Sequence, residues 1–308
     1  MKKIDDSDCV CENHLLSDHA DPDITSKLTC TNGDALQAAI KAKNSRSDLV
    51  FVNIQISGSS LERISHHDFK NFQDAEHINF SDNKISVIEK DAFKNFKKLE
   101  VLDLSSNLLS HLQENAFKHL IHLKNLSISN NKLQAIENNT FYDLHNLLQL
   151  DLSQNNLSSV VIPNFLFYRV KNLNFLSLSM NQLKTLNEST FKGNTMLERI
   201  NLTGNLWICD KKLLPLHDWL KKYETYKELA VCAEPPDMHY YTIQHALEIL
   251  FLEMKVQESP TCNATMCNCT ISKDKLVVTV DCSNRGFQRL PEMVPYKTKA
   301  LNLYNNKN

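Results

Sequence analysis

The stretch that decides the fold is LEVLDLSSNLLSHLQENAFKHLIHLKNLSISNNKL, residues 99–133. It contains one pattern twice: Leu99, Leu102, Leu104 and Asn107 are matched 24 residues later by Leu123, Leu126, Ile128 and Asn131. A lone aromatic, Phe117, stands between the two copies, ten residues after the first asparagine. A fixed period of roughly 20 to 50 residues indicates stacked structural repeats, because each repeat can bury its apolar residues only against its neighbours.

The same pattern extends over most of the chain. Its asparagine position falls at Asn83, Asn107, Asn131, Asn155, Asn181 and Asn205, in steps of 24 residues except for one of 26. Counting back 24 residues from Asn83 gives a degenerate first repeat with Phe51, Ile54 and Ile56 in the leucine positions. We therefore expect seven repeats. The two extra residues of the long step lie around Pro163, and we expect them to displace Phe165 and Phe167 into a bulge on the convex or lateral side.

The pattern L-x-x-L-x-L-x-x-N-x-L resembles the leucine-rich repeat. In L-x-L the leucines point inward and the intervening residues outward, which gives short strands stacked about 4.8 Å apart. The asparagine turns inward and bonds to backbone groups that would otherwise be buried and unpaired. One aromatic per repeat widens the convex side: Phe69, Phe93, Phe117, Phe141, Phe167 and Phe191. We expect an α/β leucine-rich-repeat solenoid, a curved horseshoe with parallel strands on its concave face and cysteine-bearing caps.

Composition excludes several classes of function. The 308 residues include 34 basic and 36 acidic side chains, so there is no basic surface for nucleic acid. No run of about 18 apolar residues is present, and we expect no membrane span within this chain. The serines lack a nucleophile motif such as G-x-S-x-G. The one close histidine pair, His119 and His122, is better explained as solvated or core residues. We expect no enzyme, no catalytic residue, no cofactor and no metal.

The cysteines favour an oxidising compartment. All nine lie outside the regular repeats, at positions 9, 11, 30, 209, 232, 262, 267, 269 and 282. Zinc binding at Cys9 and Cys11 is the disfavoured alternative, because structural zinc sites have wider spacing and fuller ligand sets. Met1 to Asp6 has no apolar region behind it, so no signal peptide is recognised. We expect an extracellular piece whose true start lies upstream of Met1.

Both ends of the array resemble the caps of leucine-rich-repeat proteins. At the N-terminal end, residues 1–48, the resemblance implies a Cys9–Cys30 disulfide and an upstream partner for Cys11, and residues 34–43 read as a short helix. After Asn205 the resemblance implies a C-terminal cap with a Cys209–Cys232 disulfide. An apolar helical stripe is expected from Leu213, Leu214, Leu216, Trp219 and Leu220, and a second helix over 241–256.

A second N-terminal cap then follows directly. By the same resemblance its cysteines pair as Cys262–Cys269 and Cys267–Cys282, and Leu301, Leu303 and Asn306 restart the repeat. The expected domains are an incomplete cap at 1–48, seven repeats at 49–205, a C-terminal cap at 206–261, a second N-terminal cap at 262–296 and the start of a second array at 297–308.

This order of modules resembles two families, the Toll receptors of invertebrates and the Slit guidance proteins. The twelve residues between Cys269 and Cys282 are more similar to Toll receptors. That resemblance implies an extracellular receptor portion at the plasma membrane, or a secreted protein if the piece is made alone. It implies binding of a Spätzle-like cystine-knot cytokine, pairing with another receptor, and innate immune or developmental signalling. The alternative is a Slit-like secreted or cell-surface guidance or adhesion protein.

Candidate site residues follow from the outward strand positions. The ligand-facing candidates are Glu100, Asp103, Lys124, Gln149, Asp151, Phe175 and Arg199. A hydroxyl column two residues before each asparagine, from Ser81 to Thr203, is expected to be structural and to bond to neighbouring turns. Eight N-x-S/T sequons are candidate glycosylation sites: Asn79, Asn125, Asn138, Asn156, Asn187, Asn201, Asn263 and Asn268. Glycans on the three concave sequons, Asn79, Asn125 and Asn201, would direct a partner to dock beside them.

Overall fold

The computed structural model describes residues 9–14, 25–30, 40, 50–159, 162–220, 230–263, 265–289, 291 and 293–307. The chain divides into two compact units. Unit 1 comprises Met1–Leu206 and Tyr223–Ala230, and unit 2 comprises Trp207–Lys222 and Val231–Asn308. Each unit is considered by itself below.

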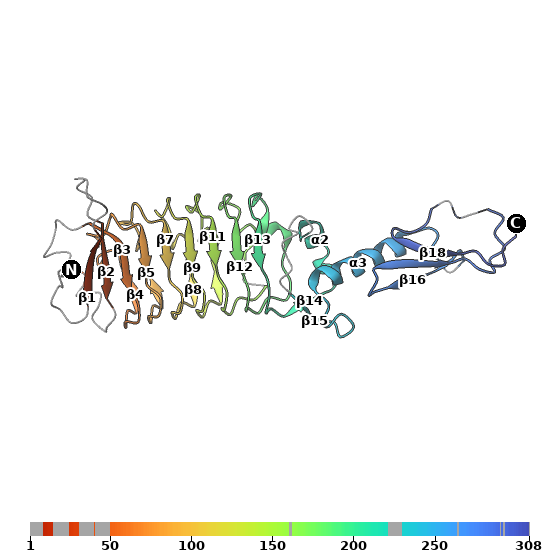
Figure 1. The fold of residues 1–308 in the computed structure, drawn as a ribbon, viewed down its shortest axis with the longest axis horizontal. Helices are drawn as coiled ribbons and strands as arrows, with labels where there is room; N and C mark the ends of the chain where they lie inside the picture. Colours follow the sequence, from red (N-terminus) through yellow and green to blue (C-terminus); the bar gives the residue numbers. More distant parts are fainter. Residues whose placement is uncertain are drawn as a thin grey trace. The chain divides into compact units, whose positions relative to one another are not determined.

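Unit 1 is a solenoid built on one sheet (Figure 1). In sheet order the described strands are β1 (Cys9–His14), β2 (Thr25–Cys30), β3 (Val50–Ile56), β5 (His77–Asn79), β7 (Val101–Asp103), β9 (Asn125–Ser127), β11 (Gln149–Asp151), β12 (Phe175–Ser177) and β13 (Arg199–Asn201). The β1–β2 pair is antiparallel, and the other pairs are parallel. Each of the seven expected repeats contributes one strand, from β3 to β13.

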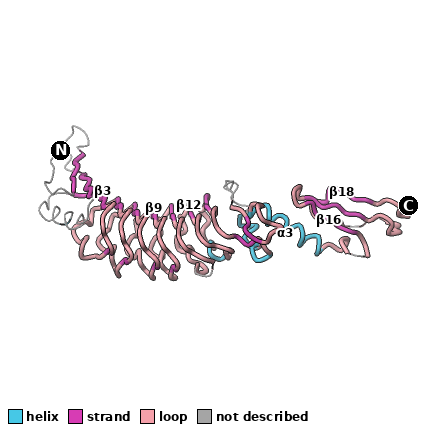
Figure 2. The backbone as a smooth tube through the Cα atoms, turned by 90° about the horizontal axis from the view of Figure 1, so that it is seen from below, coloured by secondary structure: helices cyan, strands magenta, loops and turns pink. Residues whose placement is uncertain are grey.

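The remaining backbone of each repeat runs through turns on the side opposite the sheet (Figure 2). Two short parallel pairs lie between these turns: β4 (Arg63–Ile64) with β6 (Val87–Ile88), and β8 (His111–Leu112) with β10 (Ala135–Ile136). A 3-10 helix, η1 (Glu188–Phe191), is capped by the Asn187 side chain. The helix expected over 34–43 lies outside the described residues except for Ile40, which is helical.

The core of unit 1 consists of the residues that the spacing assigns to it. The inward positions of the strands and of the residues that follow them are all buried, for example Leu102 in β7 and Leu104 directly after it. On the turn side the rings of Phe93, Phe117, Phe141, Phe167 and Phe191 form a continuous stack. Successive ring centroids in this stack are 5.8–6.0 Å apart. From the repeat of Phe93 onward, each repeat is therefore filled by aliphatic side chains behind the sheet and by a stacked ring behind the turns.

One expectation about the 26-residue step is wrong. Phe167 is not displaced: its ring is fully buried and lies 6.0 Å from the rings of both Phe141 and Phe191. Only Phe165 is exposed. Burying the Phe167 ring in the stack stabilises the fold more than two extra residues in the turn destabilise it. The two residues are therefore accommodated before Phe167. Residues 160 and 161, within that length, lie outside the described residues.

The asparagine ladder links successive coils through both ends of each amide. Asn131 donates from Nδ2 to the carbonyl oxygens of Leu104 (2.9 Å) and Ile128 (3.2 Å), and its Oδ1 accepts the N–H of Leu109 (3.0 Å). Asn107 makes the same bonds one repeat earlier. These backbone groups are buried in the turn and have no strand partner, so the asparagine satisfies them as expected from the sequence.

Unit 2 contains two helices and a small sheet. Its described elements are β14 (Trp207–Ile208), η2 (Lys211–Leu213), α2 (Pro215–Leu220), β15 (Cys232–Glu234), α3 (Ile243–Glu258), β16 (Asn268–Ser272), β17 (Val277–Asp281) and β18 (Thr298–Asn302). Thr242 caps α3 by accepting the N–H of His245. Leu213 and Leu216 are buried, as the expected stripe requires, whereas the side chain of Trp219 lies outside the described residues. In the described part of the chain, every helix is too short or too polar to cross a bilayer.

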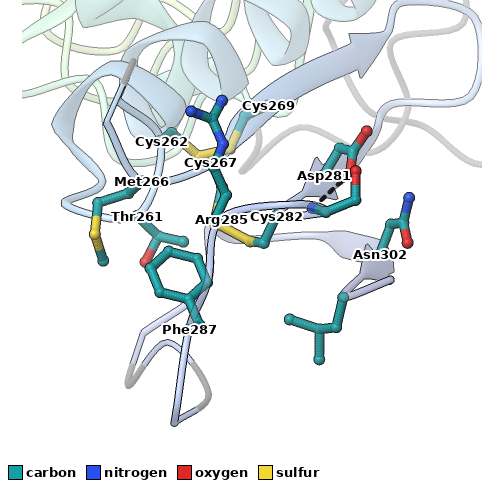
Figure 3. Close-up of a disulfide and its surroundings, with 12 residues drawn as sticks. Thr261, Cys262, Met266, Cys267, Cys269, Asp281, Cys282, Arg285, Phe287 and Asn302 are labelled. Carbon is teal, nitrogen blue, oxygen red and sulfur yellow. Dashed lines mark hydrogen bonds between the residues drawn. A yellow bond between two sulfur atoms is a disulfide. The ribbon is translucent and has the colours of Figure 1, made fainter. Parts of the chain in front are cut away.

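The second half of unit 2 is built around a disulfide-bonded hairpin (Figure 3). Strands β16 and β17 are antiparallel, and β18 adds to β17 in parallel. Leu252 of α3 packs in one core with Cys267, Cys282 and the inward residues of β17. Three polar contacts join the α3 segment to this sheet: Lys297 to Glu248 (3.2 Å), His245 to the Lys273 carbonyl (2.9 Å) and the Tyr241 hydroxyl to Asp274 (2.9 Å). The α3 segment and the hairpin therefore share a core within unit 2.

Candidate functional site

The outward side of strands β3 to β13 presents two columns of side chains in register, called here the sheet face. The first column is Asn53, His77, Val101, Asn125, Gln149, Phe175 and Arg199, and the second is Gln55, Asn79, Asp103, Ser127, Asp151, Ser177 and Asn201. Parallel pairing without a register shift from β3 to β13 keeps both columns straight. The result is one extended and mostly polar surface.

The ligand-facing candidates fall into two groups on this surface. Gln149, Phe175 and Arg199 lie in the first column, and Asp103 and Asp151 lie in the second. Glu100 and Lys124 lie in neither column. They precede β7 and β9 at the edge of the sheet face, where Lys124 Nζ is 2.7 Å from Glu100 Oε1.

Val101 is a sheet-face residue that the sequence analysis missed. In the sequence, Val101 resembles a core residue because it is apolar and adjacent to Leu102. In the structure it pairs in register with His77 and Asn125 in the first column. The signal that identifies it is position within the repeat, since Val101 stands 24 residues before Asn125.

Some side chains of the second column make hydrogen bonds to the backbone of their own turns. The carboxylates of Asp103 and Asp151 accept the N–H of the residue two positions later, at 2.8 and 2.9 Å. These are local side-chain caps that stabilise the turn. The hydroxyl column from Ser81 to Thr203 also bonds locally, so the expectation that these hydroxyls bond to neighbouring turns is wrong. Its described hydroxyl bonds lie within a single turn, such as that from Ser127 to Ser129 (3.2 Å), because the backbone of each turn already carries the contacts between neighbours.

One end of the sheet face carries an aromatic ring paired with a cation. The guanidinium carbon of Arg199 lies 5.1 Å from the ring centroid of Phe175, its register partner on the adjacent strand. A guanidinium over a ring is attracted by the negative face of the π system. Arginine and aromatic side chains are the residue types enriched in the centres of protein interfaces. This pair is therefore the strongest candidate for a binding hot spot on the sheet face.

We expect the Glu100 carboxyl to titrate below its ordinary pKa of 4.5, because Lys124 donates a hydrogen bond to it. The pair then stabilises the fold fully above the ordinary pKa, and this contribution is lost as the pH falls through the lowered one. Lys124→Ala should raise the pKa of Glu100 toward its ordinary value, as measured by NMR titration of the side-chain carboxyl carbon. The control Lys132→Ala, at an exposed position away from the pair, should leave it unchanged. An unchanged pKa in Lys124→Ala would contradict the assignment.

The sequons occupy two kinds of environment. Asn79, Asn125 and Asn201 lie in strands on the sheet face, whereas Asn138, Asn156, Asn187, Asn263 and Asn268 are exposed. The side-chain oxygens of Asn79 and Asn201 already accept backbone N–H groups of their own turns, from Ser81 (2.7 Å) and Thr203 (3.0 Å). Glycosylation at all eight positions stays a prediction.

The cysteines form bonds at both described ends of the repeat region. Disulfides join Cys209 to Cys232, Cys262 to Cys269 and Cys267 to Cys282, the same three pairs that the family resemblance implies for unit 2. Cys30 is also disulfide-bonded, and Cys9 lies directly opposite it in the β1–β2 pair. Among the described residues, no group of three or more histidine, cysteine, aspartate or glutamate side chains is arranged to hold a metal ion.

A polar sheet face on a stack of similar coils, six of which carry an inward asparagine, defines a solenoid repeat protein. The family model described as leucine rich repeat matches residues 52–109, 97–157 and 158–206, which together cover about half of the chain. This chain belongs to the leucine-rich-repeat family. No curated protein matches it. Leucine-rich-repeat domains commonly bind proteins, and solenoids of this family are typically non-enzymatic interaction scaffolds.

Proposed function

We propose that this chain is the extracellular ligand-recognition portion of a Toll-type receptor. In this proposal the sheet face binds a protein ligand, a cystine-knot cytokine similar to Spätzle, for innate immune or developmental signalling. The receptor pairs with a second receptor molecule and is attached to the plasma membrane through a span downstream of this chain.

The observation that carries the proposal is the start of a second asparagine ladder in unit 2. Asn306 donates from Nδ2 to the carbonyl oxygens of Cys282 (2.8 Å) and Leu303 (2.9 Å), and its Oδ1 accepts the N–H of Phe287 (3.0 Å). Asn131 makes equivalent bonds in unit 1. A new ladder directly after a disulfide-bonded, helix-containing segment supports the reading of that segment as a C-terminal cap.

This supports the domain order inferred from the sequence. We assign an N-terminal cap to 1–48, seven repeats to 49–205, a C-terminal cap to 206–261, a second N-terminal cap to 262–296 and a new array to 297–308. A C-terminal cap followed at once by an N-terminal cap is the arrangement that resembles Toll ectodomains. The disulfides and sequons support placement outside the cell, since disulfides persist in oxidising compartments.

The dimensions and charge of the sheet face suit a protein ligand. Seven strands about 4.8 Å apart give the sheet face a length of roughly 29 Å, so a protein ligand can contact several repeats at once. Asp103 and Asp151 favour a ligand with a basic contact surface, because complementary charge accelerates association and sets orientation. Phe175 and Arg199 supply the aromatic and guanidinium groups for the centre of the contact.

The proposal is tested by surface plasmon resonance of the full chain, secreted from cells, against a recombinant Spätzle-type cytokine. We expect saturable binding, with Kd raised at least about tenfold by Phe175→Ala combined with Arg199→Ala. The matched control combines Lys118→Ala with Lys132→Ala, both exposed and away from the sheet face, and should leave Kd unchanged. Absence of saturable binding, or equal Kd values for the two double variants, would count against this function.

The sequence of the transcript downstream of Asn308 tests the receptor class separately from the ligand. A Toll receptor predicts a short repeat block, a span of about 20 apolar residues and a cytoplasmic TIR domain. Further cap–array–cap units followed by epidermal-growth-factor modules would identify a Slit-like guidance protein instead.

A further inference from the structure

On the turn side of unit 1, the residue that follows the column phenylalanine (Phe69, Phe93, Phe117, Phe141, Phe167 and Phe191) differs in type between repeats. The residue immediately after that phenylalanine is Lys70, Lys94, Lys118, Tyr142, Tyr168 and Lys192 in successive repeats. Two tyrosines therefore interrupt a column of lysines. Their side chains are 38% and 41% exposed, respectively. Because lysine occupies the same position in four other repeats, the fold does not require an aromatic ring there.

Phe165 departs from the repeat pattern more strongly. It lies two residues before the stacked phenylalanine of its repeat, where the three preceding repeats have Asp91, Asn115 and Asn139. All four residues have a left-handed backbone, with φ between 56° and 63°. Aspartate and asparagine tolerate this conformation, but a bulky aromatic residue rarely adopts it. The Phe165 side chain is nevertheless 49% exposed, so burial does not offset the unfavourable backbone.

The three exposed rings belong to one cluster. Phe165 and Tyr168 meet edge to face, with ring centroids 6.4 Å apart. Gly193, on the next repeat, has φ of +100°, and a Cβ added there would lie 3.2 Å from the Tyr168 ring. This glycine leaves room for the ring to lie against the neighbouring turn. Arg169 joins Tyr168 to Tyr142, since its guanidinium carbon is 5.9 Å and 4.8 Å from the two ring centroids.

Each exposed ring also has a cation close to its face. Lys171 Nζ lies 6.0 Å from the Tyr168 ring, and Lys192 Nζ lies 6.0 Å from the Phe165 ring. Within the described residues, no ion pair joins Arg169, Lys171 or Lys192 to an acid. Asp143, the acid next to Tyr142, accepts the backbone N–H of His119 (3.3 Å). The cluster is therefore both aromatic and positively charged.

We propose that this cluster is a second docking surface, and that it binds an acidic segment of a protein partner. The aromatic–cationic patch is defined as Tyr142, Phe165, Tyr168, Arg169, Lys171 and Lys192. Its rings offer apolar contact area at low entropic cost, and its three cations supply the charge that complements glutamate and aspartate. It lies on the turn side, away from the sheet face, so both surfaces can be occupied independently.

The test uses fluorescence anisotropy of the secreted full chain with a fluorescein-labelled peptide of glutamates flanked by leucines. A matched peptide with lysine in place of glutamate is the probe control. We expect saturable binding of the acidic peptide only. Lys171→Glu combined with Lys192→Glu should raise its Kd at least about tenfold, since both exposed charges are reversed.

A second double variant separates ring contacts from bulk charge. Tyr142→Lys combined with Tyr168→Lys installs the residue that neighbouring repeats have at this position, so the solenoid should fold normally, as checked by circular dichroism. A purely electrostatic surface would bind the acidic peptide more tightly with two added lysines, whereas the proposed surface loses affinity at least about fivefold. Phe175→Ala with Arg199→Ala, on the sheet face, should have no effect.

Three results overturn the proposal. The first is absence of saturable binding of the acidic peptide by the unmodified chain. The second is equal or tighter binding by the double tyrosine variant. The third is binding of heparin oligosaccharides but not of the peptide, which would assign the patch to sulfated glycans. None of these results bears on cytokine binding by the sheet face, whose variants are different.

Discussion

Replacing Phe117 by alanine should lower the free energy of unfolding by about 3–5 kcal/mol. Its ring is fully buried and stacked between those of Phe93 (5.8 Å) and Phe141 (5.9 Å). Removing it leaves a cavity that the coil cannot close, because the strands on the other side of the core hold neighbouring coils at a fixed spacing. The loss is measured by urea unfolding of the full chain followed by circular dichroism.

The matched control for this variant is Ile121→Ala in the same repeat. The Ile121 side chain is about half exposed, so its removal should change the free energy of unfolding by no more than about 0.5 kcal/mol. Equal losses for the two variants would show that the phenylalanine stack does not support the solenoid. A shift of the transition midpoint in Phe117→Ala alone would confirm that it does.

Asn131→Leu should cost about 1–3 kcal/mol even though it replaces a polar residue by an apolar one of similar size. The carbonyl oxygens of Leu104 and Ile128 each keep a second asparagine donor, from Asn107 and Asn155 respectively. The N–H of Leu109 instead loses its acceptor in the buried turn. That single orphaned donor accounts for the expected loss.

Urea unfolding of the Asn131 variant is compared with Lys132→Leu, which adds the same side chain at the next, exposed position. The lysine variant should stay within about 0.5 kcal/mol of the parent. If Asn131→Leu changed the free energy of unfolding equally little, the Leu109 N–H would have another acceptor. The asparagine ladder would then not be needed for the stability of the solenoid.

The sequence predicted the parts of this fold that depend on position within a repeat. Strand register, inward leucines, the asparagine ladder and the stacked rings all follow from the 24-residue period. The errors concern positions where the repeat pattern leaves two assignments open. Repeat position assigns Phe167 to the aromatic column, but the two extra residues before it predict its displacement together with Phe165. Only packing shows that Phe167 keeps its place in the stack. Val101 was missed because an apolar residue beside an inward leucine looks like core until the register is known.

The candidate site was predictable only in part, for a related reason. Repeat position identifies which residues point outward, and five of the seven ligand-facing candidates lie in the two columns. It does not reveal that Lys124 pairs with Glu100 at the edge, or that Arg199 lies over Phe175. It also gives no indication of the aromatic–cationic patch, whose members come from three repeats and meet through the turns.

The asparagine ladder also determines where this protein tolerates insertions. Asn181 follows the 26-residue step, yet it still donates to the Leu152 carbonyl (3.1 Å) and accepts the Leu157 N–H (3.0 Å). The two additional residues fall after Leu157 and before Phe167, outside every bond of the ladder. Loop length on the turn side is thus uncoupled from the geometry of the sheet. Exposed residues can therefore be added there, as at Phe165, while the two columns of the sheet face keep their register.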